Sequence, residues 1–180
     1  MSIRRTNGSQ GYLPFYSKRT ISGQNTTDLS FTGLDGDIDL VYDIRGLLVN
    51  GSESQAADIT LQPNGISPAT DVLLSDPVTS TKADAISATY QDSVWLLGTI
   101  KAGSVLGFEI TVVADKSAGT ARCFWGTSFA PGSGNAQVLV DGLWVEGTTK
   151  LTSLVLHSSL ASGIGIGSWA VCSSPYYVRI

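Results

Sequence analysis

Apolar and polar residues alternate along most of the chain after residue 26, and this period of two predicts β-strands. In residues 38–49 the apolar side chains at even positions alternate mainly with acids and Arg45, which predicts a strand with one buried and one wet face. Similar runs predict further strands at residues 26–33, 57–62, 94–100, 104–115, 119–130, 136–147, 151–160, 163–174 and 176–180.

Turn residues separate these runs, and no helical pattern longer than ten residues appears. Asn50-Gly51 and Asn64-Gly65 are strong turn signals because both residue types tolerate the left-handed backbone region. Residues 66–92 are the least regular, so we expect a long loop with short strands and a short helix near residues 82–90. The sequence therefore predicts an all-β fold, a jelly-roll-type β-sandwich of about eight to ten strands.

The N-terminal residues lack a strand or helix period, so we expect an extended basic arm over residues 1–25 and a β-sandwich domain over residues 26–180. Residues 1–27 hold four cations and no acid, whereas the remaining seven cations and all fifteen acids follow. Cations beside aromatic rings suit a tether that enters an acidic crevice of a partner protein. They also suit nucleic acid, but the acidic body would repel phosphate, so no nucleic-acid partner is expected. The arm residues proposed for partner binding are Arg4, Arg5, Tyr12, Phe15, Tyr16, Lys18 and Arg19.

Composition favours a surface that touches other protein. Charged residues make up only 14% of the 180 residues and hydrophobic residues 42%, so few charges need to lose water when such a surface packs. The chain lacks an apolar run of membrane-spanning length, and its N-terminus lacks the apolar core of a signal peptide. We therefore expect no membrane partner and synthesis in a host cytoplasm.

Candidate chemistry is sparse. Cys123 and Cys172 lie in predicted strands, as two buried thiols or as one cross-strand disulfide. Asp35, Asp37 and Asp39 indicate either a solvated turn or a weak cation site. His157, the single histidine, is interpreted as a strand residue with a satisfied hydrogen bond, because no nucleophile motif accompanies it. No catalytic residue, metal ligand or cofactor is assigned, and the chain is not expected to be an enzyme.

Three glycines and four tryptophans leave alternatives open. Gly163, Gly165 and Gly167 would form a flat face, packed either by the chain itself or by a second subunit. We assign these glycines to subunit packing in a homo-oligomer, with a trimer expected. The tryptophans fill the space between the sheets, or they stack on sugar rings if two of them prove exposed. They are Trp95, Trp125, Trp144 and Trp169.

Residues 34–65 resemble a pattern of small virion proteins of tailed bacteriophages. The pattern has a GLDGD-x-D-x-x-Y-x-I entry strand, an NG loop and a strand that ends in L-x-PNG, and the run SSLASGIGIGSW looks similar too. The resemblance implies a jelly-roll or related sandwich subunit, often oligomeric, attached to a capsid or tail. We expect a virion structural protein, a capsid decoration (cement) protein that binds the major capsid protein or another virion protein. The alternative is a tail or fibre module that binds a receptor or carbohydrate.

Overall fold

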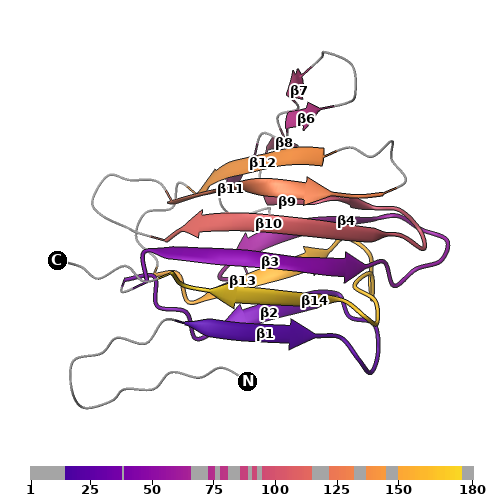
Figure 1. The fold of residues 1–180 in the computed structure, drawn as a ribbon, viewed down its shortest axis with the longest axis horizontal. Coiled ribbons are helices and arrows are strands. Elements are labelled where there is room, and N and C mark those ends of the chain that lie inside the picture. Colours follow the sequence, from indigo (N-terminus) through magenta and orange to yellow (C-terminus); the bar gives the residue numbers. More distant parts are fainter. Residues whose placement is uncertain are drawn as a thin grey trace.

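The computed structural model describes residues 15–37, 39–65, 73–75, 78–80, 86–88, 91–92, 95–114, 122–131, 137–144 and 150–175. Within them every regular element is a β-strand, and all pairings are antiparallel (Figure 1). The strands are β1 (Tyr16–Thr20), β2 (Asp28–Thr32), β3 (Val41–Val49), β4 (Ala57–Pro63), β5 (Leu73–Ser75), β6 (Val78–Ser80), β7 (Ile86–Ala88), β8 (Gln91–Asp92), β9 (Trp95–Ile100), β10 (Val105–Val113), β11 (Arg122–Phe129), β12 (Gln137–Trp144), β13 (Ser153–Ser158) and β14 (Trp169–Ser173).

Eight of these strands form a jelly roll. One sheet has the order β1-β14-β3-β10, continued by β11 and β12, and the other has the order β2-β13-β4-β9. If the eight strands are numbered along the chain, the two orders become 1-8-3-6 and 2-7-4-5. This is the strand order of a jelly roll, in which consecutive strands alternate between the two sheets except for the fourth and fifth, β4 and β9, which pair within one sheet. The predicted fold class is confirmed.

The remaining strands enlarge one sheet. The hairpin β11–β12 lies beside β10, and β5 and β6 each pair with β12. Residues 66–92 thus contain the short strands that were predicted, but the expected helix is wrong at Ile86–Ala88, which form β7 and pair with β6.

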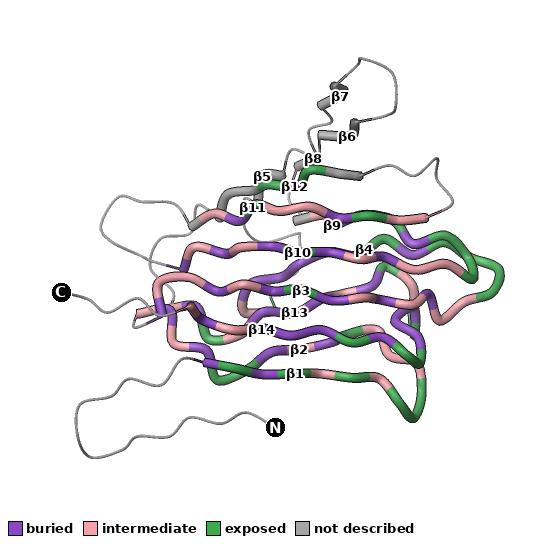
Figure 2. Tube along the Cα trace, in the orientation of Figure 1, coloured by how far each residue is buried: buried purple, intermediate pink, exposed green. Residues whose placement is uncertain are grey.

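The core fills the space between the two sheets (Figure 2). In β3 and β10 every second residue is buried, which is the predicted alternation of a sheet with one covered face. The largest fully buried side chains include Tyr42, Phe15, Phe31 and Phe124.

The sandwich begins at Phe15, which corrects the expected boundary at residue 26. Phe15 is 1% exposed, and its ring meets the ring of Tyr42 edge-on at 6.0 Å between centroids. The following residues form β1, which pairs along its length with β14. Phe15 is thus a core residue although its segment reads as irregular in the sequence. The strand that follows it, β1, forms one edge of the larger sheet and so brings the ring into the sandwich.

A buried polar network ties the first and last described segments to β3. The Tyr42 hydroxyl donates to Asp39 Oδ2 at 2.7 Å and accepts from the Asp35 amide at 2.8 Å. The Ser174 hydroxyl donates to Asp39 Oδ1 at 3.3 Å and accepts from the Phe15 amide at 2.9 Å. Asp39 was expected on the wet face, but β3 starts only at Val41, so the alternation does not extend back to it.

Candidate binding face on the larger sheet

The outward side of the larger sheet carries most of the exposed large apolar side chains. Six such side chains occur among the described residues, and five lie on this side, between 37% and 54% exposed. The sixth, Ile166, lies in the loop between β13 and β14. We call the outward side of β1, β14, β3, β10, β11 and β12 the aromatic face. Its five exposed apolar residues are Tyr16, Trp125, Phe129, Leu139 and Trp169.

Strand register places two of these aromatics in one row. Trp169 pairs with Leu47, Leu47 with Gly107, and Gly107 with Phe129. Neighbours in register share a face of the sheet, so the row runs straight across β14, β3, β10 and β11. With strands about 4.8 Å apart, the two terminal aromatics are about 14 Å apart. We call this set of four residues the apolar row.

The next row along the strands is polar at its centre. Val171 pairs with Arg45, Arg45 with Glu109, and Glu109 with Thr127. Arg45 and Glu109 are exposed and Thr127 is half-buried. A strip of charged and hydroxyl groups thus lies directly beside the apolar row.

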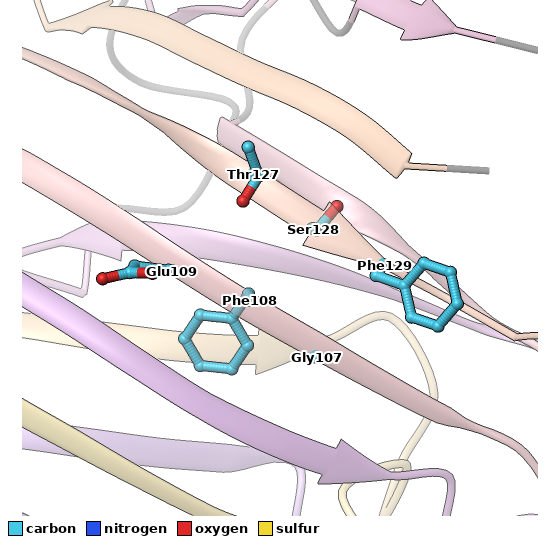
Figure 3. Close-up of a pocket in the computed structure, with 6 residues that line it drawn as sticks. All are labelled: Gly107, Phe108, Glu109, Thr127, Ser128 and Phe129. Carbon is cyan, nitrogen blue, oxygen red and sulfur yellow. The ribbon is translucent and has the colours of Figure 1, made fainter. Parts of the chain in front are cut away.

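A hollow of about 380 Å³ opens where the two rows meet on β10 and β11 (Figure 3). Gly107 leaves the floor without a side chain, and the Phe129 ring stands at one end. Its lining residues are Gly107, Phe108, Glu109, Thr127, Ser128 and Phe129. The volume is within the range of small-molecule sites, and the lining combines an aromatic ring with hydrogen-bonding groups.

Gly107 leaves open space on the surface, and its backbone conformation does not require a glycine. A Cβ atom at this position would meet only the Phe129 carbonyl oxygen, at 3.9 Å, an ordinary contact. At Gly126, on the same pair of strands, an added Cβ would collide with the Glu109 carbonyl. The glycine at 126 is therefore required by packing, whereas the glycine at 107 leaves space on the surface.

The two tryptophans whose side chains the structure describes are both exposed. Trp125 and Trp169 are exposed on the aromatic face, so the core interpretation is wrong for these two. The side chains of Trp95 and Trp144 lie outside the described residues.

The three glycines are not on a flat strand face. Residues 159–168 form turns and single bridges, and β14 starts only at Trp169. Gly163 and Gly165 are buried under the chain's own Ser158, Leu160 and Gly51, so packing within the chain is the alternative that holds. The assignment of Gly163 and Gly165 to subunit packing is wrong, because no second subunit reaches residues that the chain covers itself. Gly167 is exposed, with a φ of 93° that favours glycine.

The proposed arm residues separate into four groups. Arg4, Arg5 and Tyr12 lie outside the described residues, and Phe15 is in the core. Tyr16 and Lys18 are exposed on β1. Arg19 donates from Nε to the Ser30 carbonyl at 3.0 Å and so bridges β1 to β2 across the edge of the sandwich.

The carboxylates of the acidic turn at Asp35 and Asp37 form ion pairs with a lysine side chain. The Lys150 ammonium lies 2.7 Å from Asp35 Oδ1 and 3.7 Å from Asp37 Oδ2. Among the described residues, no three His, Cys, Asp or Glu side chains lie close enough together to hold a metal ion. The turn interpretation fits this arrangement better than a cation site.

His157 lies on the opposite sheet from the hollow. Its Nδ1 is 2.6 Å from Asp28 Oδ1, across the β13–β2 pairing, so the predicted satisfied hydrogen bond is present.

Both cysteines are free thiols, as one of the two alternatives predicted. Cys123 is in β11 and Cys172 in β14, with β3 and β10 between them. Three strand spacings amount to about 14 Å, which exceeds the roughly 7 Å limit for a disulfide. Burial raises the pKa of both thiols, and Asp43 and Asp39 add to the effect at the fully buried Cys172.

Sequence reasoning missed the hollow and its residues Glu109, Thr127 and Phe129. A signal was present, because the alternation in residues 104–115 already placed Gly107 and Glu109 on one face. A glycine within an alternating strand often marks a close approach or an open site. The partner across the strand pair, Phe129, required the register.

Comparison with known proteins adds little. No protein-family model matches the chain, and no curated protein matches it. Among solved structures, the chain is similar to the CBM2 module of the evolved Dit of Lactobacillus casei BL23 phage J-1, with 12% identity over 96% of this chain and 82% of that chain. The TM-score is 0.21, and a likeness of this size carries no argument. No helix in the described part of the chain is long and apolar enough to cross a membrane.

Proposed function

We propose that the chain is a non-enzymatic structural protein of a virus particle that binds its target through the aromatic face. One observation carries the binding role: five of the six exposed large apolar side chains of the described residues gather on one side of one sheet. Isolated exposed apolar residues are ordinary on protein surfaces, but a gathered set marks a binding surface.

The size of the face supports this role. Six strands about 4.8 Å apart, with nine residues in β3 and in β10 at about 3.4 Å each, span roughly 650 Å². The apolar part of this face is smaller than the whole, and the largest apolar patch on a monomeric protein, about 300–600 Å², is often functional. The aromatic face combines apolar side chains with polar and charged ones, so it remains hydrated when no target is bound.

The particle role rests on the resemblance of residues 34–65 to tailed-phage virion proteins and on the low charge of the chain. A capsid decoration protein is the finer proposal, with the major capsid protein as partner, and a tail or fibre component is the alternative. We keep a homotrimer as the proposed assembly, without a contact assigned to it.

Residues 1–14 are proposed as the tether, with Arg4, Arg5 and Tyr12 as its anchoring groups. The chain enters the sandwich at Phe15, beside Ser174, at one corner. The apolar row lies about 14 Å along β1 from that corner, because Thr20, four residues after Tyr16, pairs with Trp169. We propose that the particle holds the tether and that the hollow stays free for the target of the aromatic face.

Two features favour binding over catalysis. Among the described residues, Glu109 is the one carboxylate that lines the hollow, whereas a glycosidase needs two carboxyl groups about 5–9.5 Å apart. His157 and Asp28 lie on the smaller sheet, remote from the hollow.

The test is sedimentation of purified particles with added chain. We expect the full chain to co-sediment in a fixed copy number, and a variant lacking residues 2–14 to stay folded but remain in the supernatant. A Trp125→Ala/Trp169→Ala double variant should co-sediment like the unaltered chain. Failure of the full chain to co-sediment would refute the particle role, and co-sedimentation of the shortened chain would refute the tether. Loss by the double variant would mean that the aromatic face docks on the particle.

A further inference from the structure

We propose that the hollow and the apolar row form a saccharide-binding site that takes an uncharged oligosaccharide of pyranose rings. The inference rests on the proposed binding role of the aromatic face and adds the class of its target.

The two ends of the site are aromatic. Phe129 and Trp169 are 43% and 37% exposed and stand at the ends of the apolar row. The C–H side of a pyranose ring is apolar and packs on an aromatic ring. The separation of about 14 Å exceeds the width of one sugar ring, so two rings of one extended chain can each stack on an aromatic residue.

The middle of the site is open. Between the two aromatics the row contains only Leu47, which is half-buried, and Gly107, which has no side chain. The hollow of about 380 Å³ lies on β10 and β11, beside Phe129 and over Gly107 of the row. A chain that crosses the strands along the row has room to pass.

The flank of the site offers hydrogen bonds of both kinds. The Glu109 carboxylate accepts, the Arg45 guanidinium donates, and the Thr127 hydroxyl does both. Sugar hydroxyls match this set because each of them donates and accepts. Arg45 and Glu109 lie opposite each other in register and are neutral as a pair, so this flank suits an uncharged sugar, and the formal net charge of −4 of the whole chain disfavours acidic ones.

The same two charges argue against a dry protein partner. Arg45 and Glu109 lie at the centre of the aromatic face, where a protein interface is usually depleted of charge. Covering them with apolar side chains would remove both from water at a cost of several kcal/mol per ion unless the partner supplies matched groups. Saccharide hydroxyls solvate both charges in place of the water that they displace.

The test uses an array of neutral and acidic pyranose oligomers, followed by titration calorimetry with cellohexaose, maltohexaose and the hexamer of N-acetylglucosamine. We expect the full chain to bind at least one of these three probes. Gly107→Val should weaken that binding about tenfold or more, because its side chain fills the hollow. Phe129→Ala should weaken it to a similar extent, and Phe129→Tyr should retain it, since the ring is kept.

Two controls keep the result interpretable. Gly107→Val should unfold at the same denaturant concentration as the unaltered chain or higher, because an added Cβ is accommodated and valine favours strands. Thr32→Ala changes an exposed residue of β2, on the smaller sheet and outside the aromatic face, and should leave saccharide affinity unchanged.

Binding to none of the neutral oligomers overturns the inference, as does equal affinity of folded Gly107→Val and the unaltered chain. Binding that is confined to acidic oligosaccharides overturns the uncharged class. These outcomes are separable from failure of the proposed function, because co-sedimentation with particles is a separate measurement that requires no added saccharide.

Discussion

Replacement of Phe15 by alanine should destabilise the whole sandwich, although the residue lies in a segment whose sequence reads as an irregular arm. The side chain is 1% exposed and packs edge-on against Tyr42. Phenylalanine-to-alanine changes at buried sites cost about 3–5 kcal/mol, which includes the cavity that is left. With a urea dependence of about 2 kcal/mol per molar, the unfolding midpoint should fall by roughly 2 M.

Tyr16 supplies the matched control. It is the next residue, it is also aromatic, and it is 54% exposed. Tyr16→Ala should change the free energy of unfolding by no more than about 0.5 kcal/mol. Urea titrations followed by circular dichroism measure both variants. Equal, small effects of the two substitutions would refute the assignment of Phe15 to the core and restore an arm that reaches past it.

Three further predictions follow from the interior. Gly126→Ala should cost about 1–3 kcal/mol in urea unfolding because its Cβ collides with the Glu109 carbonyl of β10, and an unchanged midpoint would contradict the close strand approach. Tyr42→Phe should cost about 1.5–3 kcal/mol, because the Asp39 carboxylate loses its hydroxyl donor; a neutral result would mean that the network adds nothing to stability. Burial raises the pKa of the Cys172 thiol in the folded chain. The contribution of the protonated thiol to the free energy of unfolding is therefore complete below the unfolded thiol pKa of about 8.5 and is lost as pH rises above that value. Between pH 8.5 and 10 the unaltered chain should lose about 2 kcal/mol more stability than Cys172→Ala, and parallel pH profiles would contradict this linkage.

The alternation of residue types was sufficient to predict the fold class. In β3 and β10 the alternation of apolar and polar residues shows which side of the strand faces the core. A shift by one residue would turn the apolar side chains to solvent and lose the free energy of their burial. The jelly-roll winding was predicted only as the commonest arrangement of about eight strands. Its proof is the order of the sheets, which depends on contacts between residues far apart in the chain.

Local patterns failed where a residue's surroundings come from another part of the chain. Phe15 and β1 lack alternation, yet pairing with β14 makes them part of the sheet. Gly163 and Gly165 match a strand pattern, but the segment turns and packs under the chain's own residues. The exposure of Trp125 was hidden because β11 carries apolar side chains on both of its faces.

The candidate site was harder to predict than the fold because it is assembled from four strands. Gly107 and Glu109 were placed on one face by sequence alone, whereas Phe129 and Trp169 joined them only through register. No motif marks such a site, since a row across a sheet has no fixed spacing along the chain.

Amide chemical shifts on addition of the best-binding neutral oligosaccharide test most directly whether the aromatic face binds. We predict that the perturbed amides gather at Gly107, Phe129 and Trp169, on β10, β11 and β14, which belong to one sheet with β3 between β14 and β10. Perturbations gathered around Asp28 and His157 on the smaller sheet, or none at saturating ligand, would contradict the account.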